Sequence, residues 1–308
     1  MSSRRTVLAG FAAVLAFLPW LMPNAYLLDV VNRIGINAIA VIGLNLVMGY
    51  AGQVSLGHAG FFGLGAYASA VLTSRYGWPP VVAMGAGMLG TGLLAFAVAR
   101  PILRLQGHYL AMATLGLGII VSIVLTNESG FTGGPDGMPV DALAIAGFAP
   151  SGEFEWYWVI AACLWTAVWL AGNLVDSPIG RSLRALHGSE AAARSAGVDT
   201  ARNKALVFTI AAVFASFAGS LFAHYVGFVT PQVASFLHSI EFVTMVVVGG
   251  MASVYGSLSG AAILTALPQV LADFEGWEMV VFGALLIAVM VALPRGLVPT
   301  LMRRFERA

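Results

Sequence analysis

The chain has 308 residues, of which 59% are hydrophobic and 9% are charged, and its formal net charge is +1. Soluble globular domains carry about 25% charged residues, so this composition excludes a soluble protein. The basic residues are spread among many segments, so nucleic acid is not an expected partner. The single cysteine, Cys163, excludes a disulfide framework and a cysteine-based metal cluster.

The first apolar segment permits two interpretations. Arg4 and Arg5 precede "TVLAGFAAVLAFLPWLM", a pattern shared by cleavable signal peptides and by retained first spans. No clean cleavage site follows, and Pro19, Trp20 and Pro23 favour a retained span.

Continuous apolar runs predict about ten membrane-spanning helices, because a bilayer core about 30 Å thick needs roughly 17–25 apolar residues per helix. The expected spans are 7–22, 34–50, 54–74, 79–99, 107–126, 156–175, 205–227, 238–253, 256–272 and 279–294. Glycines interrupt the eighth and ninth spans, so short broken helices are expected there. The predicted fold is an all-α integral membrane protein, with one polytopic transmembrane domain over residues 1–308.

The charges predict the orientation of these spans. If the N- and C-termini are both cytoplasmic, all 15 basic residues except Arg33 and Arg75 fall on the cytoplasmic side, as the positive-inside rule requires. The segment 127–155 contains acidic residues but no lysine or arginine, and we expect it to be an extracytoplasmic loop. The segment 176–204 falls in the cytoplasm.

The glycine-rich stretch "NLVMGYAGQVSLGHAGFFGLGAYASAVL" (45–72) also has two interpretations. Its small residues could let another helix approach closely. Alternatively, its glycines break the helix where it lines a translocation path, because irregular backbone at membrane depth is tolerated only inside protein or beside a water-filled cavity. The candidate path residues are then Gly52, Gln53, Ser55 and His58. His58 could instead be a hydrogen-bonded core histidine.

The segment 176–204 is charged and contains a short predicted helix. Ser189 is expected to cap its N-terminus, Glu190 lies in its first turn, and Gly197 can end it in the left-handed conformation. Alanines on one side would let the helix fit into a groove on another protein. The alternative is a solvated loop whose arginines only follow the positive-inside rule.

Glu241 is the one acidic residue inside a predicted span. Intramembrane acids often have functional roles, so Glu241 is a further candidate for the translocation path. A structural or gating role is the alternative, because a carboxylate near a helix N-terminus stabilises the helix dipole.

The sequence contains no recognisable catalytic motif. It has no phosphate-binding loop of the form G-x-x-x-x-G-K-[ST], no H-E-x-x-H zinc motif and no G-x-S-x-G motif. We therefore expect no catalytic residues, no metal site and no cofactor. Any ATP hydrolysis would have to take place on a partner chain.

Several ordered motifs resemble the branched-chain amino acid permease family of ABC importers, in its LivM type. They are the stretch 45–72 quoted above, "GHYLAMATLGLGIIV" (107–121), "FTGGPDGM" (131–138), "EAAARSAGVD" followed by "RNKALVF", and "AHYVGFVTPQVASFLHSIEFVTMVVVGGMASVYGSLSGAAI" (223–263). The resemblance implies a multi-pass permease subunit of the bacterial inner membrane that imports branched-chain or related amino acids.

The same resemblance implies partners and a coupling site. The expected partners are two cytoplasmic ATP-binding subunits, a second related permease subunit, a periplasmic substrate-binding protein and membrane lipid. The residues expected to couple to the ATPase are Arg181, Arg184, Glu190, Ala191, Ala192, Arg194 and Gly197. The alternative is an ATP-independent facilitator or secondary transporter for a small polar solute such as urea or a short amide.

Overall fold

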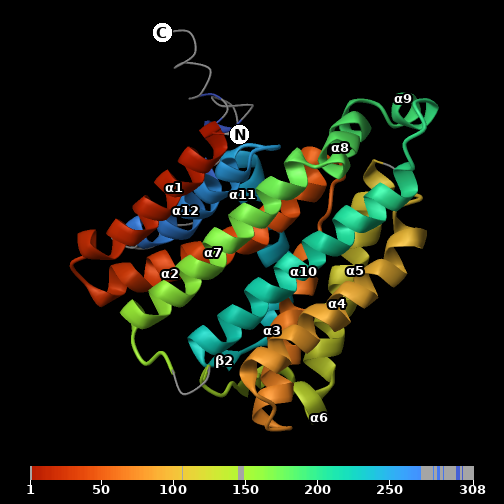
Figure 1. Ribbon diagram of the computed structural model, residues 1–308. Helices are drawn as coiled ribbons and strands as arrows, with labels where there is room; N and C mark the ends of the chain where they lie inside the picture. The colour runs from red at the N-terminus through yellow and green to blue at the C-terminus, as the bar shows by residue number, and fades with distance from the viewer. Residues whose placement is uncertain are drawn as a thin grey trace.

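The computed structural model describes residues 2–105, 107–144 and 149–271, and the positions 280, 283, 284, 287, 296–298 and 300. These residues form a bundle of helices (Figure 1). The helical stretches long and apolar enough to cross a membrane are Ala25–Tyr50, Pro80–Ile102, His108–Asn127, Glu153–Asp176 and Thr200–Val226. The chain is therefore an all-α membrane protein, as its composition predicts.

The helices in chain order are α1 (Ser2–Phe17), α2 (Ala25–Asn45), α3 (His58–Ser74), α4 (Pro80–Ile102), α5 (His108–Asn127), α6 (Ser129–Thr132), α7 (Glu153–Asp176), α8 (Pro178–Gly188), α9 (Glu190–Ser195), α10 (Thr200–Val226), α11 (Phe236–Gly249) and α12 (Val254–Leu271). Short 3-10 turns η1 (Leu18–Leu21), η3 (Gly134–Asp136) and η4 (Pro231–Ala234) and one π-helical turn η2 (Leu46–Tyr50) accompany them. Each of the first nine predicted spans coincides with one of these helices. Most of the tenth, 279–294, lies outside the described residues.

Several helix ends differ from the predicted boundaries, and three of the differences have a local reason. α2 begins at Ala25 rather than at 34, because Asp29 and Arg33 pair at 3.0 Å within the helix and so allow charged residues in it. α7 begins at Glu153 rather than at 156, because its acidic residues lie in the first turn, where they stabilise the helix dipole. α3 begins only at His58 rather than at 54, because the backbone before it is irregular.

α2 and α10 form the core of the bundle. The apolar windows of these two helices are 78% and 61% buried, against 33%, 28% and 33% for α4, α5 and α7. α10 packs on α2, α3 and α4, and α2 also packs on α7 and α12. The outer helices expose large apolar side chains such as Leu93, Ile120 and Trp169. Exposed apolar surfaces of this kind suit contact with lipid or with another membrane subunit.

Glycines allow α3 and α10 to pack closely. A Cβ atom added to Gly65 would overlap the backbone of Ser216, and one added to Gly219 would overlap the backbone of Phe62. A similar pair joins α11 and α12, where Gly249 faces the backbone of Gly256. The prediction of close helix packing through small residues is therefore confirmed in these places.

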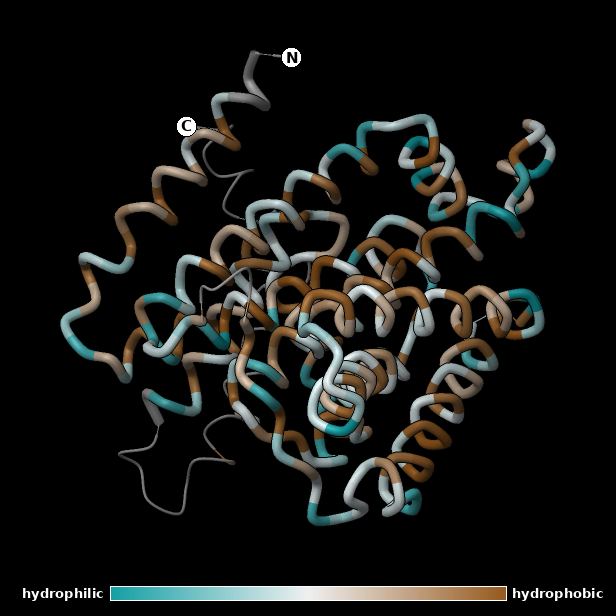
Figure 2. Tube along the Cα trace, turned by 60° about the horizontal axis from the view of Figure 1, so that its bottom comes forward, coloured by the Kyte–Doolittle hydropathy of each residue, from teal (hydrophilic) through white to brown (hydrophobic). Residues whose placement is uncertain are grey.

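The polar segments collect at the two ends of the bundle. Figure 2 shows hydrophobic residues along the helices and hydrophilic residues mostly in the segments that join them. α8 and α9 project at the end where the N-terminus lies, and α6 and β2 lie at the opposite end (Figure 1). There β1 (Met138–Pro139) pairs antiparallel with β2 (Phe228–Val229), with Met138 opposite Val229. This pairing ties the segment 127–155 to the end of α10.

Candidate functional site

α8 and α9 form a capped helical pair between two long helices. Ser177 accepts a hydrogen bond from the backbone N–H of Gly180 at the start of α8. Ser189 accepts one from Ala192 at the start of α9, as predicted. Gly197 has a φ of +82° and ends the second helix in the left-handed region, also as predicted. The short helix expected in the segment 176–204 is therefore present.

This pair buries one face and exposes the other. Leu183 and Leu186 are buried on α8, and Ala193 is buried on α9. The predicted coupling residues are on the exposed side, with the exception of the half-buried Glu190: Arg181, Arg184, Ala191, Ala192, Arg194 and Gly197. The exposed alanines give α9 an outer surface with little bulk, which another protein could contact closely.

An ion pair joins α9 to the central helix α10. Lys204 Nζ donates to Glu190 Oε2 at 2.6 Å, and Arg194 Nη2 lies 3.1 Å from Glu190 Oε1. The Lys204 side chain is only 8% exposed, and a lysine is rarely so buried unless its charge is paired. Burial acts to raise the pKa of Glu190, but the hydrogen bond and charge of Lys204, together with Arg194, outweigh it and lower the pKa. The ion pair is therefore intact at neutral pH.

The irregular segment 51–57 lies against α8. Gly52 has a φ of +67°, and a Cβ atom added to it would lie 3.1 Å from Nδ1 of His187. Helix α8 also contacts the π-helical turn η2 that precedes this segment. The predicted break in the membrane helix and the predicted cytoplasmic segment are therefore in direct contact.

The three polar residues of this break are buried, but their partners differ. His58 places Nε2 3.0 Å from the backbone oxygen of Ala40, so the geometry favours the interpretation of His58 as a hydrogen-bonded core histidine. Both amide atoms of Gln53 and the hydroxyl of Ser55 are buried without a hydrogen-bond partner among the described residues. Buried polar atoms are hydrogen-bonded in the great majority of cases, so Gln53 and Ser55 are the better candidates for contact with water or solute.

Asn45 connects this region to a second break, which separates α11 from α12. Its Nδ2 donates to the backbone oxygen of Ser253 and to the hydroxyl of Ser257, both at 2.8 Å, and its Oδ1 accepts from the N–H of Ala252 at 3.0 Å. Ala252 has a φ of +57°, which is unusual for a residue other than glycine. Asn45 therefore holds a strained turn, and sequence reasoning missed it. The signal that could have found it is an amide side chain within an apolar run, which the span 34–50 contains at Asn37 and Asn45.

Glu241 lies on the exposed side of α11. It is the sixth residue of α11 and its side chain is exposed. The next residue, Phe242, faces the interior and packs edge-on against the ring of His58. Glu241 lies beyond the first helical turn, where a carboxylate interacts most strongly with the helix dipole, so a role as an N-terminal helix stabiliser is disfavoured. Its carboxylate is available to a neighbouring chain or to solute.

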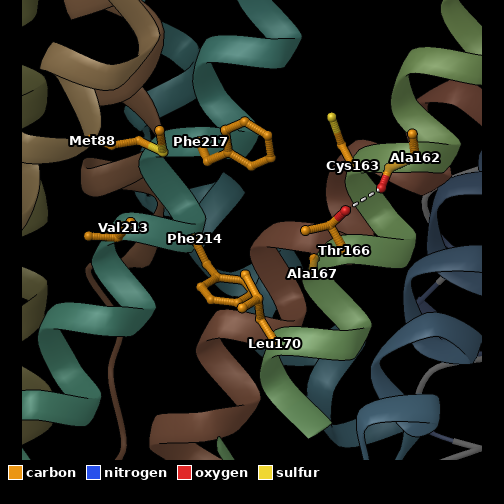
Figure 3. A pocket seen from close by; sticks show the side chains of 9 residues that line it. All are labelled: Met88, Ala162, Cys163, Thr166, Ala167, Leu170, Val213, Phe214 and Phe217. Atoms are coloured by element: carbon orange, nitrogen blue, oxygen red, sulfur yellow. Dashed lines mark hydrogen bonds between the residues drawn. The ribbon is translucent and has the colours of Figure 1, made fainter. Parts of the chain in front are cut away.

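An apolar groove of about 360 Å³ lies between α4, α7 and α10. Its lining is apolar apart from Thr166, whose hydroxyl is bonded to the backbone of Ala162 at 2.8 Å (Figure 3). Cys163 lies at its edge and forms no disulfide. Within the described part of the chain, no group of three or more histidine, cysteine and acidic residues could hold a metal ion. The groove thus offers contact area for hydrocarbon.

Comparisons with known proteins match most of the chain. Residues 26–290 match the family model described as a branched-chain amino acid transport system permease component. The permease protein LivM of the high-affinity branched-chain amino acid transport system of Salmonella typhimurium is 34% identical over 295 residues, covering 88% of this chain and 69% of the relative. LivM of Escherichia coli is also 34% identical, over 300 residues, with the same coverage.

More distant relatives belong to related systems. The Escherichia coli permease protein LivH is 26% identical over 292 residues, covering 84% of this chain and 90% of the relative. The autoinducer 2 import system permease protein LsrC of Klebsiella pneumoniae is 31% identical over 198 residues, covering 61% of this chain and 55% of the relative. No solved structure matches the chain.

Proposed function

Because this chain belongs to the family of branched-chain amino acid transport permeases, we propose that it translocates branched-chain or related amino acids as the membrane subunit of an ATP-driven importer. A periplasmic binding protein would deliver the substrate, and two cytoplasmic ATP-binding subunits would drive its passage. The chain is a transport subunit, and ATP hydrolysis belongs to those partners. The distribution of basic residues supports an inner-membrane placement with cytoplasmic termini.

The observation that carries this proposal is the attachment of α9 to α10. An exposed, small-residue helix offers a contact surface to an ATP-binding subunit, and the ion pair between Glu190 and Lys204 ties that helix to the core of the bundle. Movement of the ATP-binding subunit would therefore be passed to α10. Because α10 packs on α2, α3 and α4, the movement would reach most of the membrane domain.

The contact between α8 and the helix break gives a second route from the ATPase to the substrate path. His187 touches the segment that contains Gly52 and Gln53. Gln53 and Ser55 carry buried polar atoms that have no partner among the described residues, as expected for residues that bind water or solute in one state of a transporter. Irregular backbone beside such residues is typical of transporter paths. We place the inner end of the path at this break.

The exposed face of α11 fits the interface with a second permease subunit. It carries Glu241 together with the exposed Leu237, and a carboxylate in such a position needs a polar partner or a water-filled path. A related, LivH-like chain is the expected partner. On the opposite end, the segment 127–155 would form part of the surface on which the binding protein docks.

The direct test is affinity purification of the chain from its native membranes, followed by mass spectrometry. We expect two copies of an ATP-binding subunit and a second permease to be recovered with it. Changing both Ala191 and Ala192 to Trp places bulky side chains on the exposed surface of α9. This double variant should release the ATP-binding subunits but retain the second permease. Recovery of the chain alone, in detergent that preserves other importers, together with uptake by the isolated chain, would instead indicate an ATP-independent facilitator.

A further inference from the structure

A basic pocket lies where the end of α4 meets the beginning of α10. Its volume is about 660 Å³, within the range of about 300–1,000 Å³ that small-molecule sites occupy. Three arginines line it: Arg100 from the last turn of α4, Arg104 just after that helix, and Arg202 from the first turn of α10. Arg202 lies within the segment 176–204, but none of the three arginines is among the residues predicted to couple to the ATPase or to line the path.

The positive charge of this pocket exceeds its negative charge within the described part of the protein. The three arginine side chains are exposed and form no ion pair there. Asp199 also lines the pocket, and its Oδ1 accepts a hydrogen bond from the backbone N–H of Arg202 at 3.0 Å. Three guanidinium groups therefore face one carboxylate that is already engaged. Guanidinium groups suit phosphate, because their planar donors can bind two of its oxygens at once.

The remaining wall of the pocket is apolar and continues along the membrane face of α4. Phe96, Leu103 and Leu206 line the pocket, and the guanidinium carbon of Arg100 lies 5.9 Å from the centre of the Phe96 ring. Along the same face of α4, Leu89 and Leu93 are 69% and 67% exposed. A ligand with an anionic head and a hydrocarbon tail would satisfy both parts, whereas a free anion would leave the apolar wall uncovered.

We propose that the pocket between α4 and α10 binds the phosphodiester headgroup of an anionic phospholipid, with its acyl chains along the outer face of α4. Basic pockets between membrane helices on the cytoplasmic side are suited to such headgroups. The proposal rests on the membrane placement given above, but not on ATP-driven transport. A facilitator of the same fold would carry the same lipid site.

Native mass spectrometry of the purified complex tests this proposal. The complex is exchanged into detergent containing equal amounts of phosphatidylglycerol and phosphatidylethanolamine, and the retained lipids are counted. We expect the unmodified complex to prefer phosphatidylglycerol. The variant R100Q/R104Q/R202Q should lose this preference by about tenfold or more, since each basic residue near an anionic lipid contributes about a fivefold effect. The control R4Q/R5Q/R75Q removes the same charge from residues that neither line the pocket nor belong to the predicted coupling residues, and it should keep the preference.

The other outcomes would overturn the proposal in distinguishable ways. Equal lipid retention by the pocket variant and the unmodified complex would show that the arginines do not hold lipid. Equal losses in the pocket and control variants would indicate a general charge effect. Complete displacement of the lipid by excess inorganic phosphate would identify a free anion as the ligand. If the pocket variant loses the ATP-binding subunits but retains the lipid, the three arginines contact those subunits and not a lipid. If the triple variant does not fold, as judged by gel filtration, the single variant R202Q is measured in the same way.

Discussion

Lys204 at the start of α10 holds Glu190 at the start of α9 through an ion pair of 2.6 Å, and a longer hydrogen bond of 3.5 Å from Arg194 of α9 to Thr200 of α10 lies beside it. Lys204 is the only lysine in the chain. The pair therefore connects an exposed helix at the polar end of the described structure to one of its most buried helices. This connection is the mechanical basis of the proposed coupling.

Breaking this ion pair should destabilise the protein. In K204M the half-buried Glu190 loses its main partner, and we expect a cost of about 2 kcal/mol, which is below the range for fully buried pairs because Glu190 remains 25% exposed. The double variant E190Q/K204M should recover part of this loss, because no unpaired charge is left. Thermal unfolding of the four proteins in a double-mutant cycle measures the coupling. R194Q is the control, since Arg194 is 67% exposed and should contribute less than about 1 kcal/mol.

The same pair predicts a dependence on pH. The pKa of Glu190 is lowered from its ordinary value of 4.5, so its contribution to stability is complete above that value and disappears as the pH falls through the lowered pKa. The difference in unfolding temperature between the unmodified protein and E190Q should thus be constant from pH 8 to about pH 5. It should shrink at lower pH. A difference that shrinks already between pH 8 and 6 would contradict this assignment.

A side chain introduced at Gly197 should affect the protein only through the backbone conformation that it favours. A Cβ atom there would meet nothing within 4 Å, but φ is +82°. We expect G197V to cost about 1–2 kcal/mol of local strain and to misalign α9, so that ATP hydrolysis continues with little uptake. Asparagine tolerates this conformation, so G197N is the control and should keep most coupled uptake. Normal coupled uptake by G197V would count against a role for the geometry of α9.

Gln53 and Asn45 are both buried amides, but we expect their substitution to have opposite effects on stability. Asn45 makes hydrogen bonds from both ends of its amide, so N45L should destabilise the protein by about 1–3 kcal/mol. Gln53 has no side-chain partner among the described residues, so Q53L should leave stability unchanged or raised. If Gln53 lines the path, Q53L should nevertheless reduce uptake several-fold. Thermal unfolding and uptake are measured on both variants, and full uptake by Q53L would remove Gln53 from the path.

The close packing of α3 and α10 predicts a strong effect at Gly219. In G219A the new methyl group overlaps the backbone of Phe62, and forcing the two helices apart should cost about 1–3 kcal/mol. Gly90 on α4 has nothing within 4 Å of an added Cβ, so G90A should be neutral or slightly stabilising. Comparison of the two unfolding temperatures checks the prediction. Similar temperatures would contradict the close contact of α3 with α10.

The helices themselves could be predicted because their information is local. Apolar runs gave the positions of the first nine spans, and Ser189 and Gly197 gave the ends of α9. The predicted helix ends were wrong where a polar contact, either within the helix or with another helix, extended the helix beyond its apolar run. The pairing of Asp29 with Arg33, strengthened by a hydrogen bond from Tyr225 to Asp29 at 2.6 Å, extends α2 well beyond its apolar run.

The candidate site could be predicted only in part, because its contacts join residues far apart in the sequence. Asn45 and Ser257, or Gly52 and His187, meet only after the bundle has formed. The sequence likewise named Glu241 as a path candidate without showing which way it faces; in the structure it is exposed, while the next residue, Phe242, is buried and packs against His58. Whether one residue of α11 points inward depends on which side of the helix packs on the bundle. The sequence of an almost wholly apolar helix carries little information about which side that is.

The measurement that tests the proposed coupling most directly is the number of ATP molecules hydrolysed per amino acid imported, in liposomes containing the complete complex and its binding protein. We expect K204M to raise this ratio at least several-fold while the ATP-binding subunits remain bound. The charge-reversed variant E190K/K204E should restore it toward the unmodified value, because the ion pair is re-formed. An unchanged ratio in K204M would contradict the claim that the link between α9 and α10 transmits the work of the ATPase to the membrane domain.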